Sequence, residues 1–253
     1  MPVRVLERDP ELGLRLPVSM IGAARAGLVA NSATFEAGLW EPPSELCEPG
    51  GMGFLVLDGI LSRELILAGT TSAELLGEGD LVQSQPTAPD DGLVGYHVQW
   101  HVLEPLTVAI LDESFSRMLG AWPQVTNCLL EREMRRTQRL AVKQALLQLS
   151  PVETRLLVLF WHLSERWGRV SPEGILLQLR LPHELLGHLV GCQRASVTTA
   201  LARVTESGRV RRRDDGRWLL SGPPPGELFH VHWQQRHAAE NGRVRTGPRV
   251  SPS

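Results

Sequence analysis

Between about residue 32 and residue 111, short apolar runs alternate with turns rich in Gly, Pro and Asp. The runs hold roughly four to seven residues each, a length and spacing typical of an all-β sandwich or barrel. The run Phe54–Leu57 ends at Asp58 and Gly59, a pair that predicts a turn. Residues 97–102 (HVQWHV) alternate polar with apolar side chains, so we expect a strand with one polar face.

Helical spacing begins at Asp112, which is predicted to cap the segment ESFSRMLGA. Pro123 suits a first helical position, and a long helix is predicted from there to about Leu149. Its apolar and small residues form a stripe that needs a cover. The stripe holds Val125, Leu129, Leu130, Met134, Thr137, Leu140, Ala141 and Leu147. We expect the same helix of a second chain to cover it in a twofold dimer, and an ordinary intradomain helix is the alternative.

The region after residue 150 predicts three helices and a hairpin. The helices are expected at 152–167, at 183–191 after Pro182, and at 194–208; a strand is expected at 174–181, and a hairpin at 209–222 around the turn DDG. Either Cys192 or Gln193 would cap the third helix. A helix, a glycine turn, a second helix and a basic hairpin are typical of a winged helix-turn-helix.

The helix that begins at Arg194 predicts a DNA-reading surface. One side of it is apolar, and the other carries short polar side chains after an arginine, which suits a major groove. A solvated surface arginine is the alternative for Arg194. His183, Ser196 and Thr199 suit phosphate oxygens, and the arginines of the hairpin suit the backbone or the minor groove. The predicted DNA contacts are Arg194, Ala195, Ser196, Thr198, Thr199, His183, Arg203, Arg209, Arg211, Arg212 and Arg213.

The formal net charge of −2 conceals an asymmetry along the 253 residues. Residues 1–120 hold 17 acidic and 6 basic side chains, whereas residues 121–253 hold 11 and 20. This pattern predicts two domains, of which the second meets a polyanion such as double-stranded DNA. Two halves that attract each other would produce the same pattern.

Several features argue against export, metal chemistry and catalysis. No apolar run approaches the roughly 18 residues of a membrane span, and the first residues lack the apolar core of a signal peptide. We therefore expect a cytoplasmic protein with no membrane partner. Cys47, Cys128 and Cys192 are odd in number and far apart, which favours idle thiols over a disulfide or metal site. No nucleophile–base pair stands at a usable spacing, so we expect neither an enzyme nor a cofactor.

Four segments resemble the Crp/Fnr family of bacterial transcription regulators, and the resemblance covers about residues 35–222. EPGGMGFLVLDGILSREL (48–65) resembles the family's turn and glycine-marked strand pair, and LLGEGDLVQ (75–83) resembles the strand and turn before its ligand pocket. LTVAILDESFSRML (106–119) resembles the last strand leading into the hinge helix. LPHELLGHLVGCQRASVTTALARVTESGRV (181–210) resembles the whole DNA-reading motif.

The resemblance implies an α+β fold with a jelly-roll-like β-roll, a long dimerisation helix and a winged helix-turn-helix. Its expected parts are an N-terminal extension of little regular pattern (1–30), a cyclic-nucleotide-binding-like β-roll (31–121), the dimerisation helix (122–149), the winged helix-turn-helix DNA-binding domain (150–222) and a flexible tail (223–253). On the long helix, the expected dimerisation residues are Val125, Leu129, Leu130, Met134, Thr137 and Ala141.

The chain departs from the family pattern at the ligand pocket. Family members that bind cyclic AMP carry a Gly-Glu pair after the glycine-aspartate turn and an Arg-Ser pair on the next strand, and neither pair stands here. A degenerate effector pocket is therefore predicted at Gln83, Ser84, Tyr96 and His97. A phosphodiester needs a positive charge or a cluster of N–H donors, and no arginine lies between Arg63 and Arg117. We expect the pocket to be empty, to hold another effector, or to be filled by the protein's own side chains.

The recognition helix departs as well. Of the three base-reading positions of the cyclic-AMP receptor type, only Arg194 matches; the glutamate position is Ala195 and the second arginine position is Thr199. A different half-site is expected, with thymine-methyl contacts and indirect readout.

These observations predict a sequence-specific transcription regulator that binds a pseudo-palindromic DNA site as a homodimer, without control by cyclic AMP. RNA polymerase and an unidentified small-molecule effector are further candidate partners. The alternative is an effector-binding or protein-interaction module that has a β-roll sensor and no specific DNA target.

Overall fold

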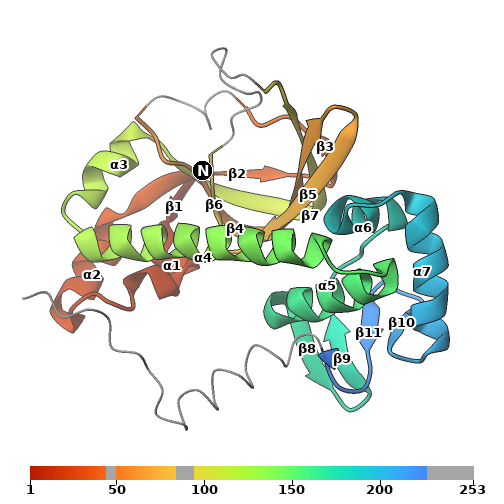
Figure 1. Cartoon of the computed structure of the whole chain (residues 1–253). Helices are drawn as coiled ribbons and strands as arrows, with labels where there is room; N and C mark the ends of the chain where they lie inside the picture. The colour runs from red at the N-terminus through yellow and green to blue at the C-terminus, as the bar shows by residue number, and fades with distance from the viewer. Residues whose placement is uncertain (44–49, 84–93, 227–253) are drawn as a thin grey trace, which may run out of the picture. The chain divides into compact units, whose positions relative to one another are not determined.

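The computed structural model describes residues 1–43, 50–83 and 94–226, and the chain divides into two compact units. The first unit is Met1–Leu147 and the second is Gln148–Ser253 (Figure 1). Predictions for Cys47, Ser84 and the tail from residue 227 onward lie outside the described residues. None of the described helices is long and apolar enough to cross a membrane.

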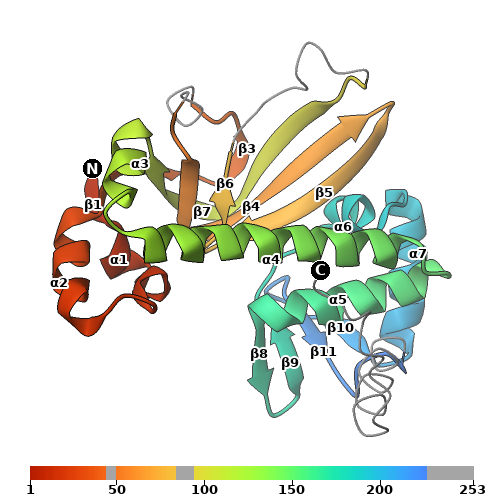
Figure 2. The same ribbon diagram turned by 60° about the vertical axis from the view of Figure 1, so that its left-hand side comes forward.

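A seven-stranded antiparallel sheet forms the frame of the first unit and corresponds to the predicted β-roll. Its strands are β1 (Pro2–Arg4), β2 (Val29–Phe35), β3 (Gly38–Trp40), β4 (Gly53–Leu67), β5 (Thr70–Gly77), β6 (Leu81–Val82) and β7 (His97–Leu111). The order is β1-β2-β7-β4-β5, with β3 paired to β7 and β6 paired to β4. Figure 2 shows β4, β5 and β7 as the long strands of this sheet.

The predicted turn at Asp58 and Gly59 is wrong, because β4 continues through both residues for 15 residues in all. The register between β4 and β7 shifts at this place, which marks a β-bulge. Gly59 has a φ of 92°, and a Cβ there would lie 2.2 Å from the carbonyl oxygen of Pro105. Positive φ and close backbone approach both favour glycine, so the same dipeptide serves a bulge as well as a turn.

The predicted alternation on β7 is confirmed. The apolar side chains of residues 97–102 are buried, and the polar ones between them are exposed or half-buried. Trp100 belongs to an aromatic cluster inside the roll, with its ring centroid 6.1 Å from that of Trp40. The ring of Trp40 lies 5.6 Å from that of Phe54 in an edge-on arrangement. Phe54 of β4 belongs to the core around this cluster, whereas Leu55 belongs to a second hydrophobic core of the same unit. Alternate residues of β4 therefore face opposite cores.

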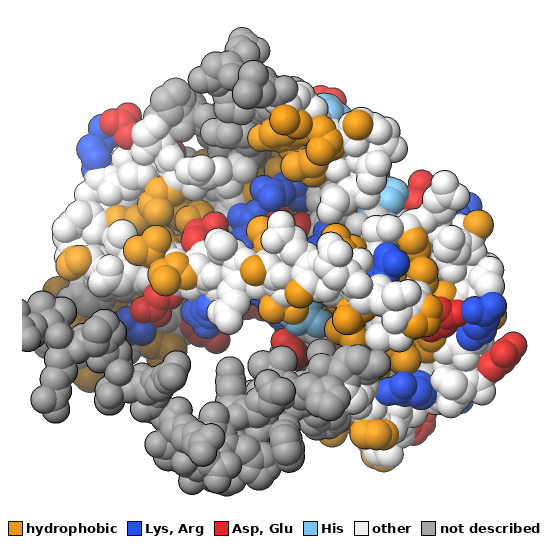
Figure 3. All heavy atoms as spheres, in the orientation of Figure 1, with side chains coloured by type: hydrophobic (Ala, Val, Ile, Leu, Met, Phe, Trp, Pro, Cys, Tyr) orange, Lys and Arg blue, Asp and Glu red, His pale blue; other side chains and the backbone are white. Residues whose placement is uncertain are grey.

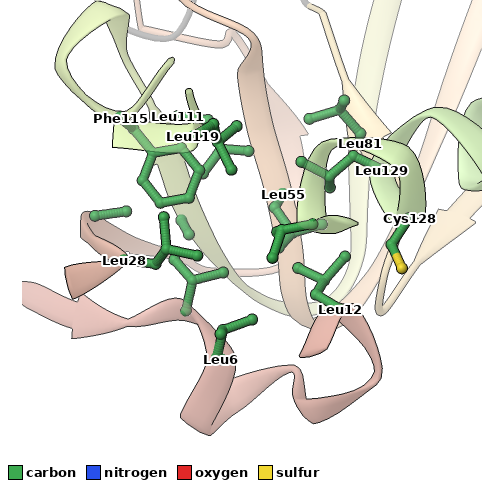
Figure 4. Packing of buried hydrophobic residues seen from close by; sticks show 14 of the residues in the cluster. Leu6, Leu12, Leu28, Leu55, Leu81, Leu111, Phe115, Leu119, Cys128 and Leu129 are labelled. Carbon is green, nitrogen blue, oxygen red and sulfur yellow. The ribbon is translucent and has the colours of Figure 1, made fainter. Parts of the chain in front are cut away.

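The N-terminal extension is folded, although residues 1–30 show little periodicity. It holds β1, α1 (Val5–Arg8), a 3-10 helix η1 (Pro10–Gly13) and α2 (Val18–Gly27). These helices are too short to show a stable apolar stripe. Their leucines, Leu6 and Leu12 among them, pack instead with Phe115 and Leu119 in the second core of the unit (Figure 4).

Two helices follow the sheet: α3 (Glu113–Leu119) and α4 (Pro123–Leu147). The predicted N-cap at Asp112 is confirmed, because its carboxylate accepts a hydrogen bond of 2.8 Å from the backbone N–H of Phe115. α4 begins at Pro123, as predicted. Val125 and Leu129 are buried within the first unit itself, at 0% and 1% exposure, so their assignment to the dimerisation face was wrong.

The second unit contains three helices and a four-stranded sheet. Its elements are α5 (Val152–Trp167), β8 (Gly168–Ser171), β9 (Gly174–Leu177), α6 (His183–Val190), α7 (Arg194–Glu206), β10 (Val210–Arg212) and β11 (Trp218–Leu220). The sheet order is β10-β11-β9-β8. The predicted strand after residue 174 ends at Leu177 and pairs with β8, which the sequence pattern missed. Trp218 packs on Phe160 of α5, with the ring centroids 5.0 Å apart.

Candidate nucleic-acid interface

The turn between α6 and α7 is compact. Gly191 ends α6 in the left-handed conformation, with φ of 66° and ψ of 43°. The backbone N–H of Cys192 then donates to the carbonyl of Gly187 at 3.0 Å, and a Cβ on Gly187 would lie 2.6 Å from the Cys192 carbonyl oxygen. α7 starts after Gln193, whose backbone is extended and whose side chain makes no capping hydrogen bond. Glycine at both places lets the two helices approach closely.

α7 has one buried face and one exposed face. Val197, Ala200, Leu201 and Val204 are buried in the second unit. The polar face of α7 is the exposed set Arg194, Ala195, Ser196, Thr198 and Thr199. Apart from Arg194, these side chains are short, so the helix backbone can approach a flat or grooved partner closely. The structure thus places five of the six predicted contact residues of this helix on one exposed surface, and the sixth, Arg203, lies further along the helix.

Both threonines of the polar face direct their hydroxyl protons to the helix. Thr198 Oγ1 donates to the carbonyl of Arg194 at 3.0 Å, and Thr199 Oγ1 donates to the carbonyl of Ala195 at 3.3 Å. Such i to i−4 hydrogen bonds are common for Thr within helices. Their oxygens therefore remain as acceptors, and Arg194 is the strong donor of this face.

His183, at the start of α6, borders the polar face of α7. Its Nδ1 lies 3.0 Å from Thr198 Oγ1. Burial lowers the pKa of His183, and the positive charges of Arg212 and Arg194 lower that pKa further. The predicted contacts His183, Arg194 and Thr198 are thus brought together, with Arg212 close enough to act on the imidazole.

The wing consists of β10, β11 and the turn between them. Arg211, Arg212 and Arg213 are exposed on it, and Arg209 is half-buried just before β10. The guanidinium carbon of Arg212 lies 5.9 Å from the centre of the Trp218 ring, a cation–π distance that orients this side chain.

Two of the predicted DNA-contact arginines are engaged by acids of the second unit. Arg203 donates to Glu153 of α5 at 2.5 Å, and Arg211 donates to Glu173 at 3.1 Å. A hydrogen bond from its own backbone N–H, followed by the one from Arg203, lowers the pKa of Glu153. Arg194, Arg212 and Arg213 are exposed and have no carboxylate partner among the described residues, so they are the arginines most available to an anion.

The first unit contains a cavity of about 460 Å³ between the roll and α4. Its lining is Gly51, Met52, Arg63, Leu65, Leu81, Gln83, Tyr96, Val98, Glu133 and Arg136. Of the predicted pocket residues, Gln83 and Tyr96 line it, whereas His97 is exposed at the start of β7. Figure 3 shows basic side chains gathered in the hollow above α4.

Two arginines line this cavity, although none lies between Arg63 and Arg117 in the sequence. Arg63 comes from β4, at the edge of that interval, and Arg136 comes from α4, beyond it. Both guanidinium groups pair with Glu74 of β5: Arg136 Nε lies 2.7 Å from Oε1, and Arg63 Nη2 lies 3.3 Å from Oε2. Burial lowers the pKa of Arg63, while burial raises the pKa of the neighbouring Glu133 carboxyl. The cavity therefore carries internally compensated charge.

The face of α4 that meets the roll is cationic. Arg132, Arg136, Arg139 and Lys143 recur at helical spacing, and each reaches a partner in the first unit. Arg132 pairs with Asp9 of the N-terminal extension, and Arg139 Nη2 lies 2.8 Å from Asp80 Oδ1. The predicted apolar stripe does not reveal this face. The recurrence of cations opposite the stripe is the signal in the sequence that indicates it.

No group of three or more His, Cys, Asp or Glu side chains in the described part of the chain is arranged to hold a metal ion.

Comparison with known proteins supports the fold. No protein-family model and no curated protein matches the sequence. Among solved structures, the c-di-GMP-responsive global regulator CLP of Xanthomonas campestris is 17% identical, with a TM-score of 0.59 over 82% of this chain and 100% of that one. FixK2 of Bradyrhizobium japonicum is 15% identical, with a TM-score of 0.59 over 77% of this chain and 94% of that one. A CRP-family transcriptional regulator of Thermus thermophilus is 15% identical, with a TM-score of 0.57 over 82% of this chain and 96% of that one.

The chain therefore has the Crp/Fnr-type fold, an antiparallel β-roll followed by a long helix and a winged helix-turn-helix. At identities below 20%, this likeness concerns architecture, and activity has to be argued from the side chains.

Proposed function

We propose that the protein is a DNA-binding transcription regulator rather than an enzyme, and that α7 enters the major groove of a DNA duplex. The observation that carries this proposal is the polar face of α7, where four short side chains follow an exposed arginine on a helix whose other face is buried. Arginine at such a position binds the O6 and N7 edge of guanine with two hydrogen bonds. Ala195 and the methyl group of Thr199 suit contacts with thymine methyl groups.

The wing supports the same proposal. Arg212 and Arg213 are exposed there and can neutralise phosphates on the DNA backbone. Arg203 and Arg211 would exchange a carboxylate partner for a phosphate on binding, so we assign them a smaller share of the affinity.

We also propose that α4 forms a homodimer through its exposed apolar positions. Leu130 and Met134 are 59% and 64% exposed, and Thr137 and Ala141 continue their helical spacing. This stripe lies opposite the cationic face that meets the roll, so it is free to pair with a second copy. A twofold dimer would place two α7 helices about 34 Å apart, on successive major grooves of a pseudo-palindrome. DNA and a second copy are thus the proposed partners, and RNA polymerase would be met by the DNA-bound dimer.

The ion pairs in the cavity favour a regulator whose DNA binding is controlled by an effector other than cyclic AMP, or by no effector. An anionic ligand would have to compete with Glu74 for both guanidinium groups. Breaking a buried ion pair of this kind is costly unless the ligand replaces the carboxylate fully.

The salt dependence of binding tests this proposal. Duplex binding by the full chain should weaken steeply between about 50 and 200 mM salt, because phosphate contacts release counterions. The preferred duplex is first selected from a random pool. Arg194→Ala should then remove most of the preference for this duplex over random duplex, a loss of roughly 1–3 kcal/mol of binding free energy. Arg25→Ala, which removes an exposed arginine of α2, is the matched control and should leave the preference unchanged. Equal loss in both variants would contradict the assignment of α7.

A further inference from the structure

His183 is held in one defined orientation at the edge of the polar face of α7. It occupies the first residue of α6, is half-buried, and has its Nδ1 3.0 Å from Thr198 Oγ1. Thr198 is one helical turn after Arg194, so the imidazole lies beside the proposed DNA-contacting arginine.

The hydrogen bonds of Thr198 determine which ring nitrogen of His183 carries the proton. The single hydroxyl proton of Thr198 is donated to the carbonyl of Arg194. With the hydroxyl proton directed to that carbonyl, we assign Thr198 Oγ1 as the acceptor and Nδ1 of the ring as the donor. In a neutral imidazole the other nitrogen, Nε2, then carries a lone pair. No described residue forms a hydrogen bond with Nε2.

A lone pair at Nε2 repels a phosphate oxygen, whereas a proton there makes a charge-assisted hydrogen bond. On this ground, which rests on the proposed DNA-binding function, we infer that His183 takes up a proton at Nε2 when DNA binds, so that DNA affinity falls as pH rises. The tautomer set by Thr198 converts an ordinary phosphate contact into a contact that requires protonation.

The charges around His183 determine the direction in which DNA affinity changes with pH and the pH range of that change. The positive charges of Arg212 of β10 and Arg194 of α7 act on the ring, and the neighbouring Glu184 of α6 is exposed to solvent. Burial and these two arginines hold the pKa of free His183 below its ordinary value, so the ring is neutral at neutral pH. A phosphate raises the pKa of His183 directly and also screens both arginines. The extra affinity is complete below the pKa of the free ring and is lost as pH rises through the pKa of the bound ring.

The test is the pH dependence of DNA affinity in matched variants of the full chain. The duplex enriched from a random pool would be titrated between about pH 5.5 and about pH 8, the range in which histidine changes charge. Each histidine that gains one pKa unit on binding makes the affinity about tenfold stronger at low pH than at high pH. His183→Gln should abolish this difference in affinity between low and high pH. His162→Gln, which removes an α5 histidine paired with Glu165, should keep the wild-type slope.

The outcomes separate this inference from the proposed function. Binding with the same pH slope in wild type and His183→Gln would overturn the inference alone. Absence of duplex binding at every pH would overturn the proposed function and the inference together.

The tautomer can be tested without DNA. In ¹⁵N spectra of the free protein above the pKa of the ring, the signal that disappears in His183→Gln should show Nδ1–H. Thr198→Ser should preserve this state, because it retains the hydroxyl, and Thr198→Val should lose it. A dominant Nε2–H form in the wild type would contradict the geometry on which the inference rests.

Discussion

Arg136 of α4 and Glu74 of β5 form a two-point ion pair, with Nε 2.7 Å from Oε1 and Nη2 3.0 Å from Oε2. Their side chains are only 9% and 13% exposed, and Arg136 also donates to the carbonyl of Leu81. Burial opposes the charge of Arg136, but the hydrogen bond to Glu74 and nearby carboxylates together raise the pKa of this guanidinium. The pair fastens the long helix to the roll at the wall of the cavity.

Removal of Glu74 should destabilise the first unit. Glu74→Gln would remove the carboxylate shared by half-buried Arg63 and buried Arg136. Loss of one partner from a buried ion pair lowers the free energy of unfolding by about 3–5 kcal/mol. Denaturant unfolding of the full chain measures the loss. Glu113→Gln breaks an exposed pair with Arg117 and should cost less than about 1 kcal/mol. Similar losses in both variants would mean that the Glu74 network contributes little to stability.

The same substitution should create an anion site. In Glu74→Gln the two guanidinium groups are released toward the cavity, and cyclic AMP at about five times its Kd should then stabilise the protein by about 1 kcal/mol. Cyclic AMP should not shift the thermal unfolding of the wild type, because Glu74 already pairs with both guanidinium groups. Adenosine, which lacks the phosphate, is the control ligand and should stabilise neither form. Stabilisation of the wild type by cyclic AMP would contradict this account of the cavity.

A charge on the exposed stripe of α4 should separate the subunits. Met134→Asp would place a carboxylate from each subunit in the proposed interface, raising the dimer Kd by about a hundredfold or more. Sedimentation equilibrium measures this constant. Leu14→Asp changes an apolar residue that is 78% exposed elsewhere in the first unit, and it should leave the dimer intact. A Met134→Asp protein that remains dimeric would place the interface on another surface.

Lys143, the single lysine of the sequence, should make stability rise at alkaline pH. Burial lowers the pKa of Lys143 from 10.5 to about 8, against the opposing effect of Glu74. Between these two values the unfolded chain holds a proton that the folded chain has released, so the free energy of unfolding increases with pH. Below about pH 8 the amine of Lys143 holds its proton in both states, so its contribution to the free energy of unfolding does not change with pH. The measurement is the difference in unfolding free energy between wild type and Lys143→Met across this range; a flat difference would show that the amine is not buried.

Local signals in the sequence predicted several helix ends and turns in both units. The cap at Asp112, the start of α4 at Pro123 and the helix–turn–helix around Gly191 depend on short-range backbone chemistry that a sequence displays directly. The strand β4 was misjudged at Gly59, because a positive φ serves a bulge and a turn equally. The short N-terminal helices were missed since tertiary packing, rather than periodicity, stabilises them.

The charge balance of the cavity was not predicted from the sequence. Arg63 of β4 and Glu74 of β5 are cross-strand partners in one hairpin, but Arg136 comes from the distant helix α4, so the full charge balance exists only after α4 has packed on the roll. The polar face of α7 was accessible to prediction because one helix carries all of it. The acids that engage Arg203 and Arg211 were not predicted, since they stand on other elements.

The central claim is that α7 reads duplex DNA as one of a symmetric pair. Selection of bound duplexes from a random pool by the full-length protein at about 50 mM salt tests it most directly, in the range where phosphate contacts are strong. The account predicts enrichment of a pseudo-palindrome whose half-site centres lie about 10 base pairs apart, and loss of that enrichment in Arg194→Ala. A protein that enriches no sequence and retains no duplex at this ionic strength would contradict it.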